Sequence, residues 1–248
     1  MNQSVTVTGM ILSATPIGEY DKRVVILTKE KGKISAFAKG ARRQNSVLMG
    51  VTNPFSFGEF VLYEGRSSYN VMQANISNYF MELSSDLEGA YYGFYFMEMA
   101  DYYTKEYNDE KQMLKLLYQT MRALASGKIN RQLVRYIFEL KTLVINGESP
   151  EMLGCANCGV DDRNMVFSSQ NHGLICEECK GIAPDGIPVS KATVYTLRYI
   201  VSSSIEKLYT FIVSDEVLAE LRQVLRQYLE SHIDKKFKSL EILEMCLG

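Results

Sequence analysis

The sequence predicts an α+β chain of several domains, in which a small N-terminal β-barrel precedes an α-helical domain with a cysteine-rich insertion. Three observations support this. The hydrophobic period changes from two residues to about 3.6 near residue 82. Two Cys-x2-Cys pairs interrupt the helical half, and Lys and Arg cluster in one N-terminal stretch. We therefore expect a barrel over 1–80, a helical bundle over 81–150 and 182–248, and an inserted finger over 151–181.

The composition bounds the class of protein. The chain has 248 residues, of which 46% are hydrophobic and 23% are charged, as in globular proteins with an ample core. No apolar run approaches the roughly 18 residues of a membrane span, and the N-terminus lacks the basic and apolar regions of a signal peptide. We therefore expect a cytoplasmic protein that makes no membrane contact and keeps its cysteines reduced.

Five short segments of the N-terminal part alternate apolar and polar residues or are rich in β-branched residues. Turn residues such as Gly, Pro and Asn separate them. Five strands are too few for a sandwich but suit a small closed barrel, for which the oligonucleotide-binding barrel is the common solution. An SH3-like barrel is the rival, because strand count alone does not separate the two. The predicted strands are 5–11, 24–28, 33–38, 58–63 and 69–76.

The predicted second and third strands lie in a strongly basic stretch. Between Asp21 and Arg43 there are eight Lys or Arg against two Asp or Glu, whereas the whole chain carries a net charge of −2. A local surplus of this kind indicates a surface for a polyanion, although a charge run can also be an ordinary solvated edge. The candidate DNA-binding residues are Lys22, Arg23, Lys31, Lys33, Lys39, Arg42 and Arg43, with Arg66 in the turn before the fifth strand.

Bases also need aromatic faces on which to stack. Phe37 lies on the third strand between two alanines, so its face is ambiguous, and we expect it in the core. Tyr63 and Tyr69 flank the turn between the fourth and fifth strands, and we expect them to be better candidates for stacking.

From about residue 82 the pattern is helical. Ser85-Asp-Leu-Glu88 predicts a capping box that opens a helix through Tyr107, and the run 91–97 is apolar nearly all round, which indicates a buried central helix. Caps and glycine stops bound the later helices. These are expected over 109–126, 130–146, 190–203, 214–233 and 239–247.

The insertion carries two cysteine pairs with metal-ligand spacing. Seventeen residues separate the Cys155–Cys158 pair from the Cys176–Cys179 pair, within the range typical of tetrahedral zinc. Four thiolates leave no open coordination position, so we expect one structural Zn²⁺. Because the segment 150–181 has little apolar content, we also expect the metal to supply much of its folding free energy.

Two other readings of the cysteines are weaker. Disulfides are unusual in a reducing compartment, and a redox pair would need a thioredoxin-like βαβ context. His172 lies in the insertion and is expected to be a spectator, since four cysteines already suffice. Cys246 is expected to be a buried thiol in the last helix.

Several segments together resemble one protein family. The stretch Thr28-Lys-Glu-Lys-Gly-Lys-Ile34 and the stretch Ala38-Lys-Gly-Ala-Arg-Arg43 are similar to the RecO family of bacterial recombination mediators. So are Phe138-Glu-Leu-Lys-Thr-Leu143, the following Ser149-Pro-Glu-Met-Leu153, and the cysteine quartet. The resemblance covers essentially the whole chain. It departs at Tyr136-Ile137, where a basic residue is expected, with Arg135 as the nearest substitute.

The resemblance implies a non-enzymatic, nucleoid-associated DNA-binding protein. Such proteins bind single- and double-stranded DNA, anneal complementary strands and, with RecR, help RecA replace single-strand-binding protein; they are also functionally linked to RecF. The family also implies a contact with the acidic tail of single-strand-binding protein. Arg131 and Arg135 lie four residues apart and are the expected basic rim for that tail.

Two alternatives come from other classes. A nuclease or nucleotidyl transferase would need clustered carboxylates for metal ions or a phosphate-binding loop, and neither pattern occurs. With only two histidines, a catalytic centre built on several of them is impossible. A zinc-stabilised scaffold whose basic barrel binds an acidic protein is the remaining alternative.

Overall fold

The computed structural model describes residues 4–65, 68–161 and 164–247. The chain divides into two compact units, one comprising Met1–Ala125 with Phe237–Gly248 and the other Ser126–Lys236. The first unit holds the barrel, the helices that follow it and the C-terminal helix. The second holds the remaining helices and the cysteine-rich insertion. These two units do not coincide with the three domains expected from the sequence, and that three-domain division stays a prediction.

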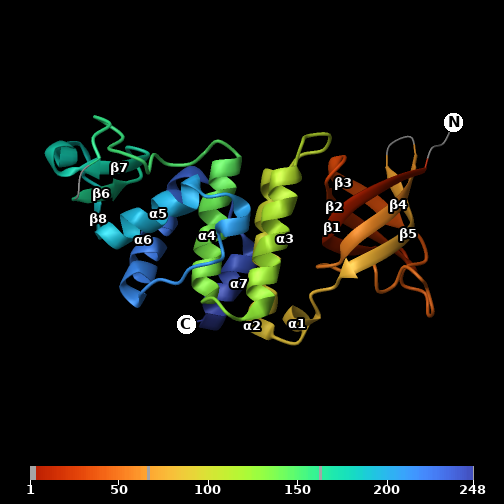
Figure 1. Cartoon of the computed structure of the whole chain (residues 1–248). Helices are drawn as coiled ribbons and strands as arrows, with labels where there is room; N and C mark the ends of the chain where they lie inside the picture. Colours follow the sequence, from red (N-terminus) through yellow and green to blue (C-terminus); the bar gives the residue numbers. More distant parts are fainter. Residues whose placement is uncertain (1–3, 66–67, 162–163, 248) are drawn as a thin grey trace. The chain divides into compact units, whose positions relative to one another are not determined.

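The N-terminal part is a closed five-stranded barrel, drawn in red to orange in Figure 1. Its order is β1-β2-β3-β5-β4, with β1 also paired to β4. Neighbours are antiparallel except β3 and β5, which run parallel through Ala36–Tyr69 and Phe37–Asn70. This topology is that of the oligonucleotide-binding barrel and separates it from the SH3-like rival. The strands are β1 Ser4–Ile17, β2 Asp21–Thr28, β3 Gly32–Ala38, β4 Phe57–Glu64 and β5 Tyr69–Asn78.

The alternation in the sequence separates the core of the barrel from its outer surface. Val24 and Ile26 of β2 and Ile34, Ala36 and Ala38 of β3 are fully buried in one cluster. The residues between them on β3 are half-buried and face outward. Burial of this apolar face stabilises the barrel, and the outward residues form its outer surface.

Helices of the first unit follow the barrel. Asp86 caps α2 by accepting a hydrogen bond from the Gly89 N–H, so the expected capping box at Ser85 was wrong by one residue. The expected burial of α2 is confirmed for Tyr92 and Phe96, which are fully buried, whereas Phe94 is 41% exposed. The helices are α1 Met81–Ser84, α2 Leu87–Tyr103, α3 Lys111–Ser126 and α7 Lys238–Leu247.

The C-terminal helix α7 packs against α2. The Glu98 carboxylate of α2 accepts hydrogen bonds from the backbone N–H groups of Lys238 (3.3 Å) and Ser239 (3.0 Å). These are donors of the first turn of α7, which has no earlier carbonyl to bind, and a carboxylate there also complements the helix dipole. Every helix in the described part of the chain is too short or too polar to cross a membrane.

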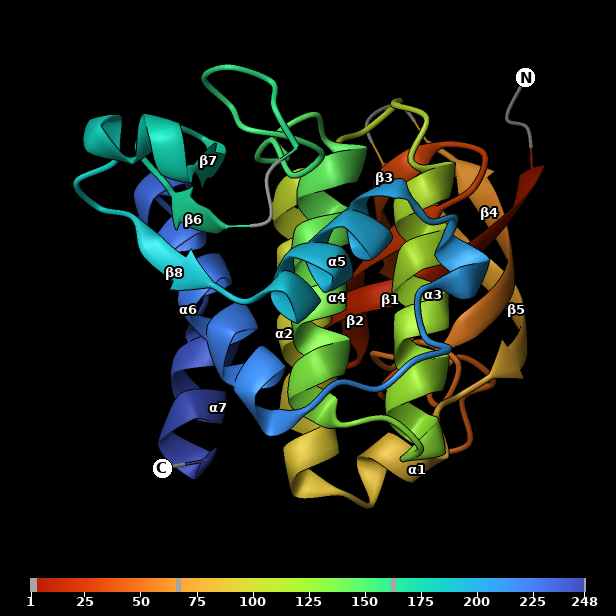
Figure 2. The same cartoon turned by 60° about the vertical axis from the view of Figure 1, so that its left-hand side comes forward.

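The second unit is built from three packed helices (Figure 2). Each helix begins at a side-chain cap that the sequence predicts, in which the side chain accepts a hydrogen bond from a backbone N–H of the first turn. The caps are Asn130 for α4, Ser190 for α5 and Ser214 for α6. The elements are α4 Arg131–Ile145, α5 Lys191–Ser202, a short 3₁₀ turn Ile205–Lys207, and α6 Asp215–His232.

The cysteine-rich insertion contains a small antiparallel sheet in the order β7-β6-β8 (Figure 2). Every residue of β6 and β7 is buried, and Phe167, Leu174 and Ile175 are fully so. The apolar residues of this segment are therefore concentrated in a buried hairpin, and the expectation that the metal supplies much of its folding free energy stays a prediction. The elements are β6 Met165–Ser168, β7 Gly173–Cys176, a 3₁₀ helix Glu177–Ile182, and β8 Ile187–Val189.

A buried lysine closes α5. Lys141 of α4 is 7% exposed, and its Nζ donates to the carbonyl oxygens of Ile200 (3.2 Å), Val201 (2.9 Å) and Ser203 (2.7 Å). These carbonyls lie at the C-terminal end of α5, where the helix itself offers no donors and where a cation complements the dipole. Burial lowers the pKa of the Lys141 ammonium, and the three acceptors replace the water it has lost.

We predict that Lys141→Met lowers the free energy of unfolding by about 2 kcal/mol, because the carbonyls at the end of α5 lose their donor. Chemical denaturation followed by circular dichroism measures the change. Lys128→Met, at an exposed lysine before α4, is the matched control and should have almost no effect. Equal stability of the two variants would contradict this role for Lys141.

Candidate nucleic-acid interface and metal centre

The β2–β3 hairpin has one covered end. At its turn, the Lys33 N–H donates to the Lys105 carbonyl (3.0 Å) and the Tyr107 N–H donates to the Lys31 carbonyl (3.2 Å), so the α2–α3 connection lies against it. Gly32 makes this approach possible: its φ is +66°, and a Cβ there would lie 2.6 Å from the Lys105 carbonyl oxygen. This end of the hairpin is therefore occupied by the protein itself.

Two predicted DNA-binding lysines lie at that covered end. The Lys33 ammonium pairs with the Asp101 carboxylate at 3.0 Å and also donates to the Asp101 carbonyl. Lys31 is half-buried. The structure thus separates these two lysines from the others in the basic stretch, and it gives Lys33 an internal partner.

The opposite end of the hairpin carries the basic loop, residues 39–43. Gly40 adopts φ +66°, and its N–H donates to the Asp21 carboxylate at 2.7 Å. The Arg42 N–H donates to the Tyr20 carbonyl at 2.8 Å, and the Arg43 guanidinium lies 5.1 Å from the centre of the Tyr20 ring. These contacts hold the basic loop against the β1–β2 turn.

Lys22 holds the next part of this connection. Its Nζ donates to the Asn53 side-chain oxygen at 2.7 Å and to the Met49 carbonyl at 3.3 Å. Burial, and to a lesser extent the charge of Arg42, lowers the pKa of Lys22. Lys22 is therefore an internal tie between β2 and the connection to β4.

Four of the predicted cations are exposed at the open end: Arg23, Lys39, Arg42 and Arg43. The Arg23 Nε donates to the Ser35 hydroxyl on the outer face of β3 at 2.8 Å. Arg66 lies outside the described residues. The structure thus gathers half of the predicted set on one edge of the barrel.

The aromatic expectations were partly wrong. Phe37 is half-buried on the outer face of β3, because it alternates with the core residues Ala36 and Ala38. Tyr69 is 3% exposed and belongs to the core, and its pKa is raised to about 12 by burial and by the nearby Glu64. Tyr63 remains half-buried at the surface.

The four cysteines of the insertion converge. Their Sγ atoms all lie within 4.8 Å of one another, and those of Cys158 and Cys176 are 3.7 Å apart. A tetrahedron with metal–sulfur bonds of about 2.3 Å has edges of about 3.8 Å, whereas a disulfide requires about 2.05 Å. The thiols are free and fit one metal ion.

The backbone around the first pair forms a tight turn. The Gly159 N–H donates to the Cys155 carbonyl at 2.8 Å, and Gly159 has φ +76°, a conformation that glycine adopts without strain. Burial would raise the pKa of the Cys155 thiol, but the backbone N–H groups of Cys176, Cys158 and Asn157 outweigh it and lower that pKa to about 6. These hydrogen bonds favour the thiolate form of Cys155, which is the form that binds a metal ion.

The other expectations about the insertion had mixed outcomes. His172 is not in the cysteine cluster; its Nδ1 lies 2.9 Å from Nε2 of His232. Cys246 is exposed, so its expected burial was wrong. Its helix ends the chain, with Met245 beside it 74% exposed.

Both arginines of the predicted basic rim on α4 are half-buried. Arg135 forms an ion pair with the buried Glu139 at 2.7 Å, and Arg131 lies at the start of α4. A groove of about 510 Å³ opens beside Gln132, where Arg222 and Arg226 of α6 line its wall. These arginines are four residues apart on an exposed helix face, a signal that the sequence did contain.

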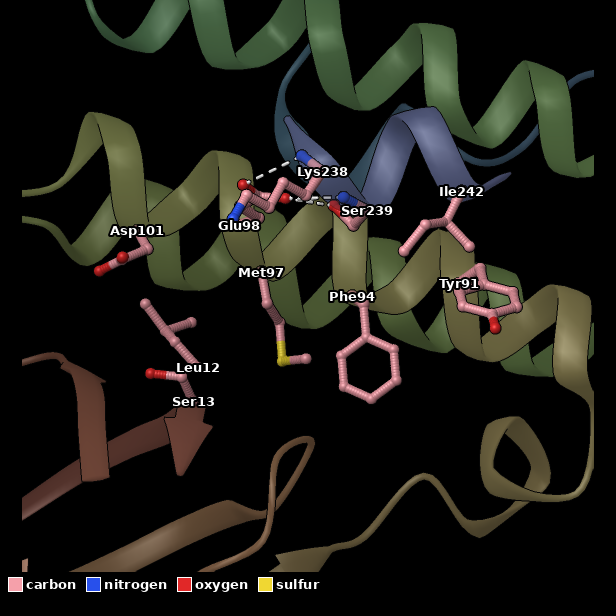
Figure 3. A pocket seen from close by; sticks show the side chains of 10 residues that line it. All are labelled: Leu12, Ser13, Tyr91, Phe94, Met97, Glu98, Asp101, Lys238, Ser239 and Ile242. Atoms are coloured by element: carbon pink, nitrogen blue, oxygen red, sulfur yellow. Dashed lines mark hydrogen bonds between the residues drawn. The ribbon is translucent and has the colours of Figure 1, made fainter. Parts of the chain in front are cut away.

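A further cavity, of about 400 Å³, lies in the first unit among β1, α2 and α7 (Figure 3). Leu12, Phe94 and Met97 make its wall largely apolar. Its two carboxylates already have partners, since Asp101 pairs with Lys33 and Glu98 binds the start of α7. The cavity therefore presents no pair of carboxylates available for metal-dependent catalysis.

Two family models match the chain. The model described as "Recombination protein O N terminal" matches residues 1–80, and that described as "Recombination protein O C terminal" matches residues 84–241.

Three relatives, each named "DNA repair protein RecO", match the chain over nearly their full length. The protein of Alkaliphilus metalliredigens is 35% identical over 236 residues, covering 94% of this chain and 96% of its own. The protein of Acetivibrio thermocellus is 31% identical, covering 95% and 94%. The protein of Bacillus subtilis is 28% identical, covering 95% and 92%.

We predict that the purified protein binds one metal ion per chain and that Cys155→Ser or Cys176→Ser abolishes this binding and lowers the unfolding temperature. Elemental analysis and thermal denaturation are the measurements. Cys246→Ser, at the exposed cysteine outside the cluster, is the control and should change neither. Full metal content in Cys155→Ser would contradict the four-thiolate site.

The apparent metal affinity should fall as the pH is lowered from about 9 toward 6. Protons compete with the metal for the thiolates, and the pKa values of Cys158, Cys176 and Cys179 are raised above the usual value, while that of Cys155 is lowered. Competition with a chromophoric chelator at several pH values measures this. An affinity independent of pH over that range would contradict thiolate ligation.

Proposed function

Because this chain belongs to the RecO family of DNA repair proteins, we propose that it is a DNA-binding recombination mediator that works without catalysing a reaction. It binds single- and double-stranded DNA and anneals complementary strands. With RecR, it helps RecA load onto DNA coated with single-strand-binding protein, in functional connection with RecF. Its place is the bacterial cytoplasm, at the nucleoid.

The observation that carries DNA binding is the exposed basic loop. Lys39, Arg42 and Arg43 are exposed, while the backbone beneath them is fixed by Asp21 and Tyr20. Cations that neutralise phosphates release counterions, and a loop already held in place loses little conformational entropy on binding. Arg23, on the neighbouring strand, extends this basic edge. Lys22 and Lys33 are not proposed to contact DNA, because their ammonium groups have partners within the protein, and neither is Lys31, which lies at the covered end of the hairpin.

The proposed metal is one structural Zn²⁺ held by Cys155, Cys158, Cys176 and Cys179. Four cysteine ligands at tetrahedral spacing suit zinc and leave no site for a substrate. The insertion therefore contributes to stability through both the metal and its buried β6–β7 hairpin.

The acidic tail of single-strand-binding protein is proposed to bind in the second unit. The groove beside Gln132 has Leu218 and Ala219 as apolar lining, and it sets two cations, Arg222 and Arg226, against one carboxylate, Asp215. A tail that combines carboxylates with an apolar end matches this lining. Because Arg135 is paired with the buried Glu139, the proposal moves from the Arg131–Arg135 rim to the arginines of α6. Arg226 is itself paired with Glu230 at 2.8 Å, but both side chains of that pair are about two-thirds exposed, and such surface pairs hold their partners weakly.

The rival function is a zinc-stabilised scaffold whose barrel binds an acidic protein. Both functions use the same cations, but only DNA binding requires a steep dependence on salt together with affinity for strands of any sequence. Family membership and the barrel topology favour DNA.

We predict that the triple variant Lys39→Glu, Arg42→Glu, Arg43→Glu lowers the affinity for a single strand more than tenfold. It should also reduce the slope of log affinity against log salt by about 2, since each phosphate contact on a single strand contributes about 0.7. Fluorescence anisotropy of a labelled strand at several salt concentrations measures both.

The matched control reverses three exposed cations of α3, Lys111, Lys115 and Arg122, and so makes the same change in net charge. It should bind nearly as the wild type does. Equal losses in both variants would mean that total charge, rather than the basic loop, governs binding. If the loop variant folds normally and binds DNA as tightly as the wild type, the DNA-binding site does not lie at this edge of the barrel.

A further inference from the structure

The barrel aligns four outward residues from four strands on one rung, here called the outer row: Arg23, Phe37, Asn70 and Tyr63. Arg23 of β2 pairs with Phe37 of β3, Phe37 pairs with Asn70 of β5, and Asn70 pairs with Tyr63 of β4. Residues paired across strands point to the same side of the sheet. The outer row could not be predicted from the sequence alone, because its members lie up to 47 positions apart.

The neighbours of the outer row show that it faces away from the core. Val24, Ala36, Leu62 and Val71, each next to a member of the row in sequence, all belong to the barrel core. Arg23 is exposed, and Phe37, Asn70 and Tyr63 are half-buried, so part of each ring is accessible. The barrel thus presents two aromatic rings with an amide between them.

The spacing suits one strand of nucleic acid. Neighbouring strands of a sheet lie about 4.8 Å apart, so Phe37 and Tyr63, two strands apart, are separated by roughly 10 Å. Stacked bases repeat at about 3.4 Å, so separate bases of a single strand can reach the two rings. The amide of Asn70 can both donate and accept hydrogen bonds at a base edge between them.

The charges around the outer row orient such a strand. Arg23 ends the row on β2, and Lys39 follows Phe37 by two residues, so cations lie at one end. Exposed Glu64 follows Tyr63 at the other end and accepts a hydrogen bond from Tyr69. Phosphates are therefore favoured toward Arg23 and the basic loop, while the region near Tyr63 is left to the uncharged bases.

We infer that the outer row is a base-stacking platform for single-stranded nucleic acid, distinct in role from the basic loop. This inference rests on the proposed DNA binding and adds a division of labour to it. The basic loop contacts phosphates, which both single strands and duplexes offer. The outer row contacts base faces, which a duplex keeps stacked inside, and so it favours single strands.

The test compares Phe37→Ala and Tyr63→Ala with wild type on a thymidine oligomer and on a duplex of the same length. Each variant should lose about tenfold in affinity for the single strand and less than about threefold for the duplex, since stacking on one aromatic residue is worth about that much. Tyr79→Ala, at a 40%-exposed tyrosine after the barrel, is the matched control and should alter neither.

A direct readout of stacking is available because the chain has no Trp. Phe37→Trp and, separately, Tyr63→Trp place one indole in the outer row, and a thymidine oligomer should quench its fluorescence. An abasic strand of equal length, bound to saturation, offers the same phosphates without bases and should leave it nearly unchanged. Far-ultraviolet circular dichroism checks that each variant is folded, and either indole position alone suffices as a reporter.

The outcomes separate the two proposals. Wild-type protein that binds neither DNA overturns the proposed function and, with it, this inference. Wild-type binding that Phe37→Ala and Tyr63→Ala leave intact overturns the platform alone. So do equal losses on single strand and duplex, or equal quenching by the abasic strand.

Discussion

The candidate interface depends on two neighbouring charged residues at the start of β2. The Asp21 carboxylate binds the Gly40 N–H, and the Lys22 ammonium binds Asn53 and the Met49 carbonyl. Between β3 and β4 the described chain forms turns without a helix or strand, so side-chain bonds of this kind decide its position. Because these two residues hold the connection from within, the nearby Lys39, Arg42 and Arg43 are left at the surface.

The second unit shows the same use of charge for internal order. Lys141 donates hydrogen bonds to the carbonyls at the end of α5, and the cysteine cluster brings together the two turns that carry the cysteines. These contacts fix the end of α5 and the insertion, and α6 packs against both α5 and β8.

Much of the fold could be predicted because it rests on local patterns. Alternating residues gave the five strands, the caps Asn130, Ser190 and Ser214 gave three helices, and cysteine spacing gave the cluster. The roles of single cations could not be predicted in this way. Lys33 meets Asp101, which is 68 residues away, and Phe37 stands between two alanines whose pattern does not reveal the core side. Such outcomes depend on tertiary contacts that no local window contains.

We propose that DNA is held at the open end of the β2–β3 hairpin, where the basic loop lies. Photocrosslinking of a single strand to the wild-type protein, with the adducts mapped by peptide mass spectrometry, tests it most directly. We expect adducts in the peptides that carry Phe37, Tyr63 and the basic loop. Adducts confined to residues 126–236, with none in the barrel, would contradict it.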